Sequence, residues 1–338
     1  MSRTAIASAV AAAVAVAAFA GILTCGSVDI PAADVWAVLT GGDVGRGVWR
    51  VIVLDTRLPA ALTAALAGGA LAVAGLLLQT TFANPLAGPS ILGISTGASL
   101  GVAVVMLMLG GAVLSASGQA AVVAGALAGA AVVMLALLAV AGVVRSATML
   151  LIVGILIGYL ASSAIALLNF FASREGVHSF TIWGLGTFCN LTMGRMPVFA
   201  AATIAAILLS MCYIKPLNAL LLGTRYAESA GVDVRRTRLG LLALSGVLTA
   251  VVTAWCGPIG FVGLVVPHVA RLALHTSNHR SLLPYTALAG AATGLVCQWL
   301  SVAPGAGGVI PINAITPLMG VPVIIYIIVR RRSIFYFN

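Results

Sequence analysis

Residues 58–101 read LPAALTAALAGGALAVAGLLLQTTFANPLAGPSILGISTGASLG, and the uncharged run that begins at Leu58 continues to Val144. The run contains 87 residues and no Asp, Glu, Lys or Arg. A helix crosses the hydrocarbon core of a bilayer, about 30 Å thick, with roughly 20 apolar residues. Because polar and turn-forming residues interrupt the run at 79–89 and at 115–119, we expect three transmembrane helices in it.

The composition of the whole chain indicates a membrane protein. Of its 338 residues, 62% are hydrophobic and only 7% are charged, whereas a soluble domain is about 25% charged because its surface must stay hydrated. The same numbers exclude a disordered chain and a secreted scaffold held by disulfides. The five cysteines are scattered without C-x-x-C spacing, so no thiolate metal site is indicated.

The other charge-free stretches raise the number of expected spans to about ten, in an all-α bundle formed by one transmembrane domain, residues 1–338. A single long span in 239–270 would reduce the total to nine. The stretches are 4–28, 146–173 and 196–214 with one span each, 239–270 with two that break at Gly257-Pro258, and 281–329 with two separated by 304–311.

The distribution of cations favours ten spans, because cytoplasmic loops carry an excess of Lys and Arg. With ten spans and a cytoplasmic N-terminus, 12 of the 17 cations face the cytoplasm, and both chain ends do so. Nine spans would place Arg330, Arg331 and Arg332 outside. The net charge of +10 therefore reports membrane topology and does not indicate a nucleic-acid partner.

The first hydrophobic stretch has an alternative interpretation as a signal peptide, because Arg3 precedes an Ala-rich apolar run. A signal peptide has a shorter apolar region, of about 7–15 residues. The stretch 4–28 is longer than that, so we expect it to be the first span.

The sequence contains no recognisable site that would let this chain use ATP or couple transport to an ion. There is no G-x-x-x-x-G-K-[ST] loop for a nucleotide, and Lys215 is the only lysine. No Asp, Glu, Lys or Arg lies in the middle of an expected span, where ion-coupled carriers usually hold an ionisable group. We therefore expect another chain to supply the energy. The alternative is an ion-coupled secondary transporter of inverted-repeat type, since backbone carbonyls can also bind a coupling ion such as sodium.

Gly93-Ile94-Ser95-Thr96-Gly97 matches G-x-S-x-G, the turn that carries the nucleophile of many hydrolases. That turn follows a strand and needs a carboxylate and a histidine, whereas here the surroundings are helical. Small residues four apart also let membrane helices approach closely. We interpret the glycines as helix-packing residues and expect no enzyme activity; an intramembrane serine hydrolase is the alternative.

Four segments together resemble one family. They are RLPAALTAALAGGALAVAGLLLQTTFANPLAGPSILGISTGASLG at 57–101, LGTRYAESAGV at 222–232, GPIGFVGLVVPHVAR at 257–271 and TPLMGVP at 316–322. This set is similar to the permease subunit of the ABC importers for iron chelates (ferric siderophores and haem) and cobalamin. The resemblance implies a type II ABC importer permease of ten helices in the bacterial inner membrane.

The resemblance also implies partners. They are a second copy of this chain, two ATPase subunits that use ATP and Mg, and a solute-binding protein, periplasmic or lipid-anchored, that delivers the chelate. This chain itself would bind no cofactor, and lipid would surround it. Which chelate is carried stays open, because the chain has Gln298 and Val309-Ile310-Pro311 where the family tends to have charged residues.

The longest cytoplasmic loop, 215–238, contains the segment that resembles the family's coupling helix. Pro216 and Gly223 bracket a short apolar stripe that predicts one helix, and a second short turn ends at Gly231. The residues implied in contact with the ATPase are Leu222, Gly223, Thr224, Arg225, Ala227, Glu228 and Gly231. From this we expect that Trp at Gly223 or Ala227 displaces the ATPase without unfolding the bundle.

The remaining site residues follow from the same resemblance. Asn84-Pro85-Leu86 must break a helix, since proline lacks a backbone donor, and this turn narrows the cytoplasmic exit in the family. A further constriction is expected from the loop before the fifth span, and arginines on the outer face are expected to meet the binding protein. The residues are Asn84, Pro85, Leu86, Ser146 and Thr148 for the gate, Arg50, Arg57 and Arg174 for docking, and Pro267, His268 and Arg271 as a structural motif.

Overall fold

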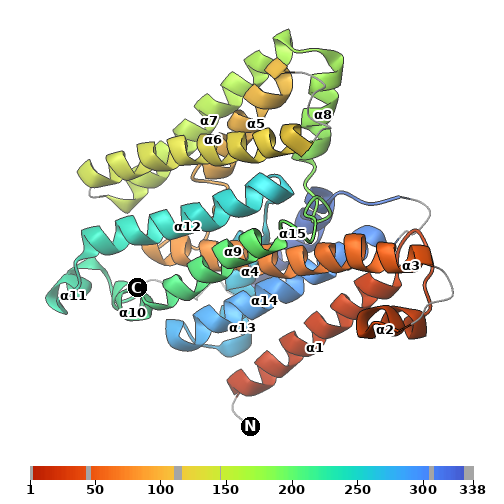
Figure 1. The fold of residues 1–338 in the computed structure, drawn as a ribbon. Coiled ribbons are helices and arrows are strands. Elements are labelled where there is room, and N and C mark those ends of the chain that lie inside the picture. Colours follow the sequence, from red (N-terminus) through yellow and green to blue (C-terminus); the bar gives the residue numbers. More distant parts are fainter. Residues whose placement is uncertain (1–2, 43–46, 110–115, 145, 304–307, 331–338) are drawn as a thin grey trace.

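The computed structural model describes residues 3–42, 47–109, 116–144, 146–303 and 308–330, and every regular element in these ranges is a helix (Figure 1). In chain order they are α1 (Arg3–Thr24), α2 (Ala32–Thr40), α3 (Gly47–Val51), η1 (Ile52–Arg57), α4 (Leu58–Thr81), α5 (Ile94–Leu109), α6 (Ala116–Val143), α7 (Ala147–Phe171), α8 (Arg174–Gly184), α9 (Met196–Met211), α10 (Ile214–Leu220), α11 (Thr224–Ser229), α12 (Val234–Cys256), α13 (Val262–Leu274), α14 (His279–Val302) and α15 (Ile312–Arg330).

The helices support a bundle of about ten spans. Among the described residues, five helical stretches are long and apolar enough to cross a bilayer, and α9 with α10 forms a sixth that bends by 56°. The helices α5, α13 and α15 are apolar but shorter, and α14 has 24 residues. The break expected at Gly257-Pro258 is present, since α12 ends at Cys256 and α13 begins at Val262.

Two expected boundaries differ from the structure. The second span begins at Gly47 and not at Leu58, because α3 and the π-helical turn η1 continue directly into α4. Arg50, Asp55 and Arg57 lie in this extension. Because these residues are charged, the extension is not part of any uncharged run. The turn expected at 115–119 is wrong in position, because residues 116–119 already belong to α6. Residues 110–115 lie outside the described residues.

The helix α4 lies at the centre of the bundle, between α12, α13 and α14 (Figure 1), and most of its residues are buried. Glycines bring its backbone against two neighbours. A Cβ atom at Gly75 would overlap the backbone of Gly263 in α13, and one at Gly68 would overlap that of Gly290 in α14. The three helices therefore form one tightly packed block.

A second group of helices packs around α5. Gly97 and Gly101 of α5 meet Gly129 and Gly125 of α6 so closely that none of the four has space for a Cβ atom, and Gly93 lies against α7. The G-x-S-x-G glycines thus serve helix packing, as we interpreted them.

Short helices at one end of the bundle were not expected. The helix α2 lies between the first two spans, and α8 follows α7 directly (Figure 1). Both occupy segments that contain charged residues, which we read only as loops. Ser173 caps the start of α8 by accepting a hydrogen bond from the Gly176 amide at 3.2 Å.

The start of α1 and the 214–229 hairpin, formed by α10 and α11, lie at the same end of the bundle. Arg3 is within hydrogen-bonding distance of His275 at the end of α13 (3.3 Å), and α10 contacts the start of α14. Most cations of the described residues also belong to this end. The cations Arg46, Arg145, Arg331 and Arg332 lie outside the described residues.

Candidate functional site: the hairpin end of the bundle

The 82–93 turn, the segment between α4 and α5, is held to the last carbonyls of α4. The amides of Ala83 and Asn84 donate to the carbonyls of Thr80 (3.2 Å) and Gln79 (3.1 Å). The Asn84 side chain accepts a hydrogen bond from the Leu86 amide at 2.9 Å, an Asx turn that redirects the chain. Leu86 is consequently displayed at the tip, 50% exposed.

Two buried side chains of α13 attach this helix to the turn and to α4. The His268 Nε2 lies 2.8 Å from the Pro85 carbonyl, a distance and partner that require the ring N–H to donate. Arg271 donates to the Gln79 Oε1 at 2.6 Å, and Gln79 donates to the Leu264 carbonyl at 3.1 Å. Within the expected motif of Pro267, His268 and Arg271, His268 thus fastens α13 to the 82–93 turn, Arg271 fastens it to α4, and Pro267 lies inside α13.

Ser146 and Thr148 lie at the N-terminal end of α7, and both are exposed. The Ser146 hydroxyl accepts a hydrogen bond from the Met149 amide at 3.3 Å and thereby caps the helix. Among the described residues, no hydrogen bond joins them to the 82–93 turn.

The 214–229 hairpin consists of two short helices joined at Leu222 and Gly223. Gly223 has φ +97°, a conformation that residues with a Cβ rarely adopt. Leu217 and Leu220 anchor α10 in the core. The expected contact residues that project from the hairpin into solvent are Leu222, Gly223, Thr224, Arg225, Glu228 and, just beyond it, Gly231.

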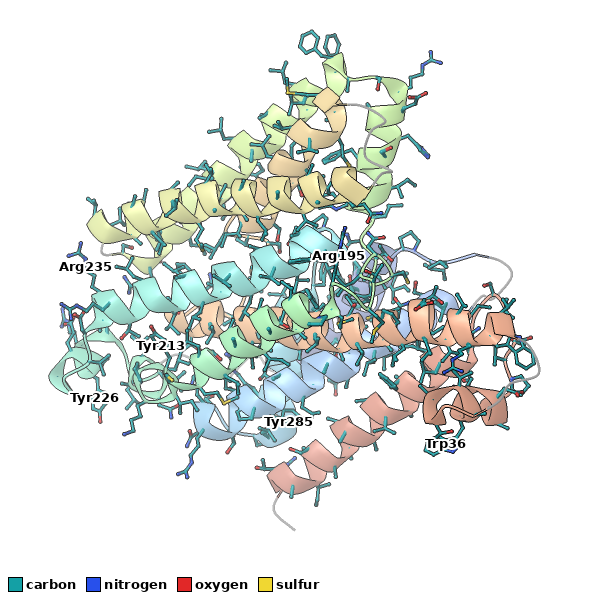
Figure 2. All side chains as sticks on the ribbon, in the orientation of Figure 1. Trp36, Arg195, Tyr213, Tyr226, Arg235 and Tyr285 are labelled. Carbon is teal, nitrogen blue, oxygen red and sulfur yellow. The ribbon has the colours of Figure 1, made fainter. Side chains whose placement is uncertain are left out.

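Ala227 differs from the other expected contact residues, because its side chain is fully buried in the core below the hairpin. Trp at this position would disrupt the hairpin itself, so this variant cannot separate the loss of a partner contact from the loss of the hairpin structure. Trp at Gly223 would strain the backbone for the reason given above. Tyr226, which the sequence reading did not select, is 54% exposed beside Leu222 at 60%. Figure 2 shows Tyr226 at the hairpin end of the molecule.

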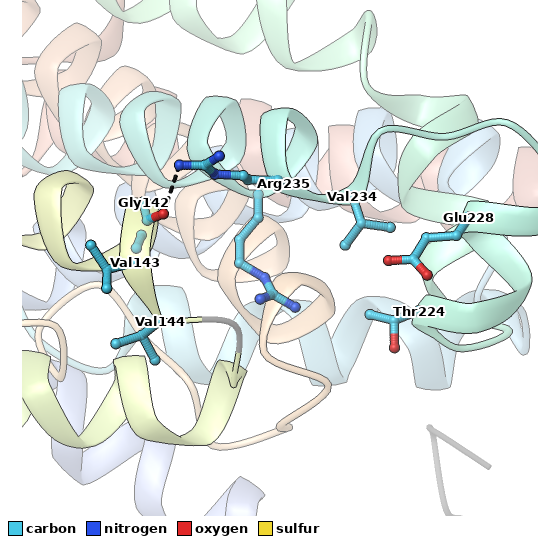
Figure 3. Close-up of a pocket in the computed structure, with 9 residues that line it drawn as sticks. Gly142, Val143, Val144, Thr224, Glu228, Val234 and Arg235 are labelled. Carbon is cyan, nitrogen blue, oxygen red and sulfur yellow. Dashed lines mark hydrogen bonds between the residues drawn. The ribbon is translucent and has the colours of Figure 1, made fainter.

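A cleft of about 540 Å³ separates the hairpin from the end of α6 (Figure 3). Arg235 of α12 reaches across it, and its Nη2 donates to the Gly142 carbonyl at 2.6 Å. This cation satisfies a carbonyl at the C-terminal end of α6, where positive charge is favourable. Thr224 and Glu228 of the hairpin and Arg238 of α12 also line the cleft.

The three outer arginines have different surroundings. Arg50 and Arg174 are exposed, as a docking role requires. Arg57 is only 8% exposed, and its guanidinium donates to the carbonyls of Leu23 (2.7 Å), Thr24 (2.9 Å) and Val28 beyond the end of α1. The contacts of Arg57 are therefore structural, and it presents no docking surface.

A second cavity, of about 480 Å³, lies nearer the opposite end of the bundle. One wall carries the hydroxyl groups of Ser95, Thr96 and Ser99 in α5, and another carries Phe180 and Trp183 in α8. The sequence reading missed this cavity, since the hydroxyls and the aromatic rings come from segments with no shared motif. None of the residues that line it is charged.

A model of the FecCD transport family matches residues 7–330, which is almost the whole chain. The chain belongs to the FecCD transport family. This confirms the resemblance drawn from the four sequence segments.

Relatives and a solved structure agree with this FecCD assignment. The chain is 33% identical to the hemin transport system permease protein HmuU of Yersinia pestis, over 92% of this chain and 93% of that protein. It is 34% identical to the vitamin B12 import system permease protein BtuC of Shigella boydii, over 89% and 90%. A solved structure described as a metal-chelate type ABC transporter in an inward-facing conformation matches with a TM-score of 0.82 at 25% identity, over 95% and 97%. The chain is thus a membrane permease of FecCD type.

Proposed function

We propose that this FecCD permease is the membrane subunit of an ATP-driven ABC importer that moves a metal chelate into the cytoplasm. The observation that carries the proposal is the likeness over 92% of the chain to a haemin permease, together with that to a vitamin B12 permease. The whole chain, residues 1–338, acts as one transmembrane domain. It catalyses no reaction itself, and a separate ATPase chain uses ATP and Mg.

The 214–229 hairpin is the proposed seat of that ATPase. Two exposed apolar side chains, Leu222 and Tyr226, project from it, and such groups are typical anchors of protein interfaces. Arg225 and Glu228 provide polar contacts at the rim, while the adjacent cleft accepts side chains of the partner. We also propose that the permease is a homodimer. Its two hairpins then bind one ATPase each.

The exposed apolar surface of α7 supports the homodimer. Within one chain, the buried residues of α7 are only Leu150, Gly154 and Ala161. Ile165 of α7 and Pro317 of α15 line the hydroxyl-bearing cavity, so a second copy related by a two-fold axis would close the cavity between the subunits. The transport pathway then runs along the axis, from this cavity to the 82–93 turns. Leu86, with Asn84 and Pro85 behind it, acts as the cytoplasmic gate, and Ser146 and Thr148 lie beside the exit.

The opposite end of the bundle faces the outside of the bacterial inner membrane, and both chain ends lie in the cytoplasm. The contact of Arg3 with His275 supports this orientation for the N-terminus. A solute-binding protein approaches Arg50 and Arg174, which attract its acidic residues and orient the encounter. The candidate chelates are ferric siderophores, haem and cobalamin, of which hemin and vitamin B12 are named for the two relatives.

Uptake into proteoliposomes tests this function. The chain is reconstituted with its ATPase, and uptake of haemin, of cobalamin and of a ferric siderophore is measured with ATP, without ATP, and with ATP plus a protonophore. We expect uptake of one chelate that requires ATP and is unaffected by the protonophore. Uptake that persists without ATP and collapses with the protonophore would instead establish an ion-coupled secondary transporter.

A further inference from the structure

A buried histidine lies between the 214–229 hairpin and the central helix α4. His279 is the first residue of α14 and has no exposed surface. Its Nδ1 is 3.0 Å from the Asn218 Oδ1 in α10, and its Nε2 is 2.9 Å from the Thr80 hydroxyl in α4. Its backbone amide also donates to the same Asn218 oxygen at 2.8 Å. One side chain therefore bridges the hairpin to α4.

The donors and acceptors of this bridge have one consistent arrangement for a neutral imidazole. The Asn218 Oδ1 accepts from the His279 amide, so it must also accept from the ring, which places the ring proton on Nδ1. The Nε2 then accepts a hydrogen bond from the Thr80 hydroxyl. The same hydroxyl also lies 3.1 Å from the Leu76 carbonyl oxygen, so its proton is shared between the two acceptors. The Asn218 side-chain amide donates in turn to the Asn278 Oδ1 at 3.0 Å, which fixes its orientation.

From Thr80 the chain of hydrogen bonds continues to the 82–93 turn. The Thr80 carbonyl accepts the Ala83 amide, and the neighbouring Gln79 carbonyl accepts the Asn84 amide. His268 holds the far side of the same turn through the Pro85 carbonyl. A displacement of Asn218 is thereby connected to Leu86 through short, directional contacts.

We propose that His279 is a positioning residue that transmits movement of the 214–229 hairpin to the 82–93 turn. The proposal rests on the proposed function, in which an ATPase moves the hairpin. The physical reason is that separation of Asn218, His279 and Thr80 would leave buried polar groups without partners, which is unfavourable. The apolar contacts of Leu217 and Leu220 are non-directional and permit sliding. The hydrogen-bonded bridge, by contrast, fixes how α10 and α4 lie relative to each other.

The test removes the hydroxyl at Thr80 and leaves the packing in place. Thr80→Val is nearly isosteric and leaves the His279 Nε2 without its donor. Thr81→Val is the matched control, because Thr81 is buried in the next position and, among the described residues, its hydroxyl bonds only to the Leu77 carbonyl of its own helix, at 2.7 Å. Thr80→Ser restores a hydroxyl at the original position and serves as the rescue variant.

Movement of the turn is measured directly in the permease–ATPase complex. Spin labels are attached to Leu86→Cys and Met149→Cys, after the exposed cysteines Cys25, Cys189 and Cys212 are replaced by serine. The distance between the labels is recorded with and without ATP, and ATP hydrolysis is measured in parallel. A merely structural role of Thr80 would lower hydrolysis and thermal stability together, whereas the proposed role separates hydrolysis from turn movement.

For Thr80→Val we expect hydrolysis within about twofold of the parent and about a fivefold smaller fraction of complexes that change distance with ATP. Thr81→Val and Thr80→Ser should respond like the parent. If Thr80→Val responds as fully as Thr81→Val, or loses hydrolysis and stability together with the response, the transmission role is overturned while the importer function stands. If the parent itself shows no change with ATP, the ATP-driven function fails, and the transmission role fails with it.

Discussion

Arg57 is a buried cation whose guanidinium is held by hydrogen bonds to backbone carbonyls. The carbonyls of Leu23, Thr24 and Val28 surround its guanidinium, and two of them belong to the C-terminal end of α1, where the helix dipole favours a cation. Gly26 completes the site with φ +154°, and a Cβ atom there would lie 3.0 Å from the Arg57 Nη2. The arginine thus holds the end of α1 against the start of α4.

We predict that Arg57→Ala lowers the free energy of unfolding by about 3 kcal/mol, because three carbonyl acceptors lose their donor. Thermal unfolding of the purified permease in detergent measures the change. The control is Arg50→Ala, a nearby exposed arginine that should leave the unfolding temperature unchanged. If Arg57→Ala is as stable as the parent but binds the solute-binding protein more weakly, Arg57 is a docking residue and the structural role is wrong.

Residue roles were the least predictable part of the sequence. The R-L-P motif identified Arg57, but only its burial distinguishes a structural arginine from a docking one. Ala227 is buried and its neighbour Tyr226 is exposed. The coupling-helix motif includes Ala227 and does not include Tyr226. The role of His279 could not be predicted, since its partners at positions 80 and 218 are far away in sequence. Such roles depend on long-range contacts that no local pattern encodes.

At the scale of elements, glycine decides how closely α4 approaches its neighbours. The Gly75 backbone lies directly against that of Gly263, and lipid provides no hydrophobic force that would compensate for a loosened contact. Close backbone packing is therefore a main source of cohesion between α4 and α13.

We predict that Gly75→Ala destabilises the permease by about 3 kcal/mol, since one methyl group forces the two helices apart. Gly184→Ala is the control, because Gly184 ends α8 and a methyl group added there would meet no neighbouring atom within 4 Å. Unfolding temperatures of the two variants in the same detergent give the comparison. Equal temperatures would mean that the α4–α13 contact contributes little to stability.

The 214–229 hairpin gives a second prediction at this scale. Leu222→Asp with Tyr226→Ala removes the two exposed apolar side chains and adds a charge, while Ala227 and the buried leucines of α10 stay in place. We expect about a hundredfold weaker binding of the ATPase at an unchanged unfolding temperature, measured by co-purification and by thermal unfolding. Ser229→Ala on the same helix is the control. Retention of the ATPase by the double variant would contradict the assignment of the hairpin as its seat.

Helix positions followed from the sequence more closely than residue roles did. Charge-free runs located α7, α9, α12 and α14 within a few residues, because the thickness of the bilayer sets the length of a span. The same criterion failed where charged residues lie within a helix, as in η1, and where helices lie outside the spans, as in α2 and α8. Ser173 caps α8, while α2 and η1 pack through Val35, Val38 and Val53 in a small apolar cluster, and the criterion detects neither contribution.

At the scale of the whole molecule, charge separates the two ends of the bundle. The hairpin end carries Arg3, Lys215, Arg225, Arg235, Arg236, Arg238, Arg271 and Arg280 among the described residues, placed there by the ends of the helices on which they lie. The sequence could predict this arrangement because transfer of a cation across the membrane is unfavourable wherever it occurs in the chain. It could not predict the grouping of α5, α6 and α7 beside the α4 block, which arises from glycine contacts between distant segments.

The orientation of the molecule gives the last prediction. Ser229 of the hairpin and Glu175 of α8 are exposed side chains at opposite ends of the bundle. In a background without the exposed cysteines, single Ser229→Cys and Glu175→Cys variants are treated with a maleimide that does not cross membranes. Because we propose that the cationic end faces the cytoplasm, Glu175→Cys should react in intact spheroplasts, and Ser229→Cys should react only in inverted vesicles. The opposite pattern would place the hairpin outside the cell, away from any cytoplasmic ATPase, and would remove the physical basis for driving the permease through it.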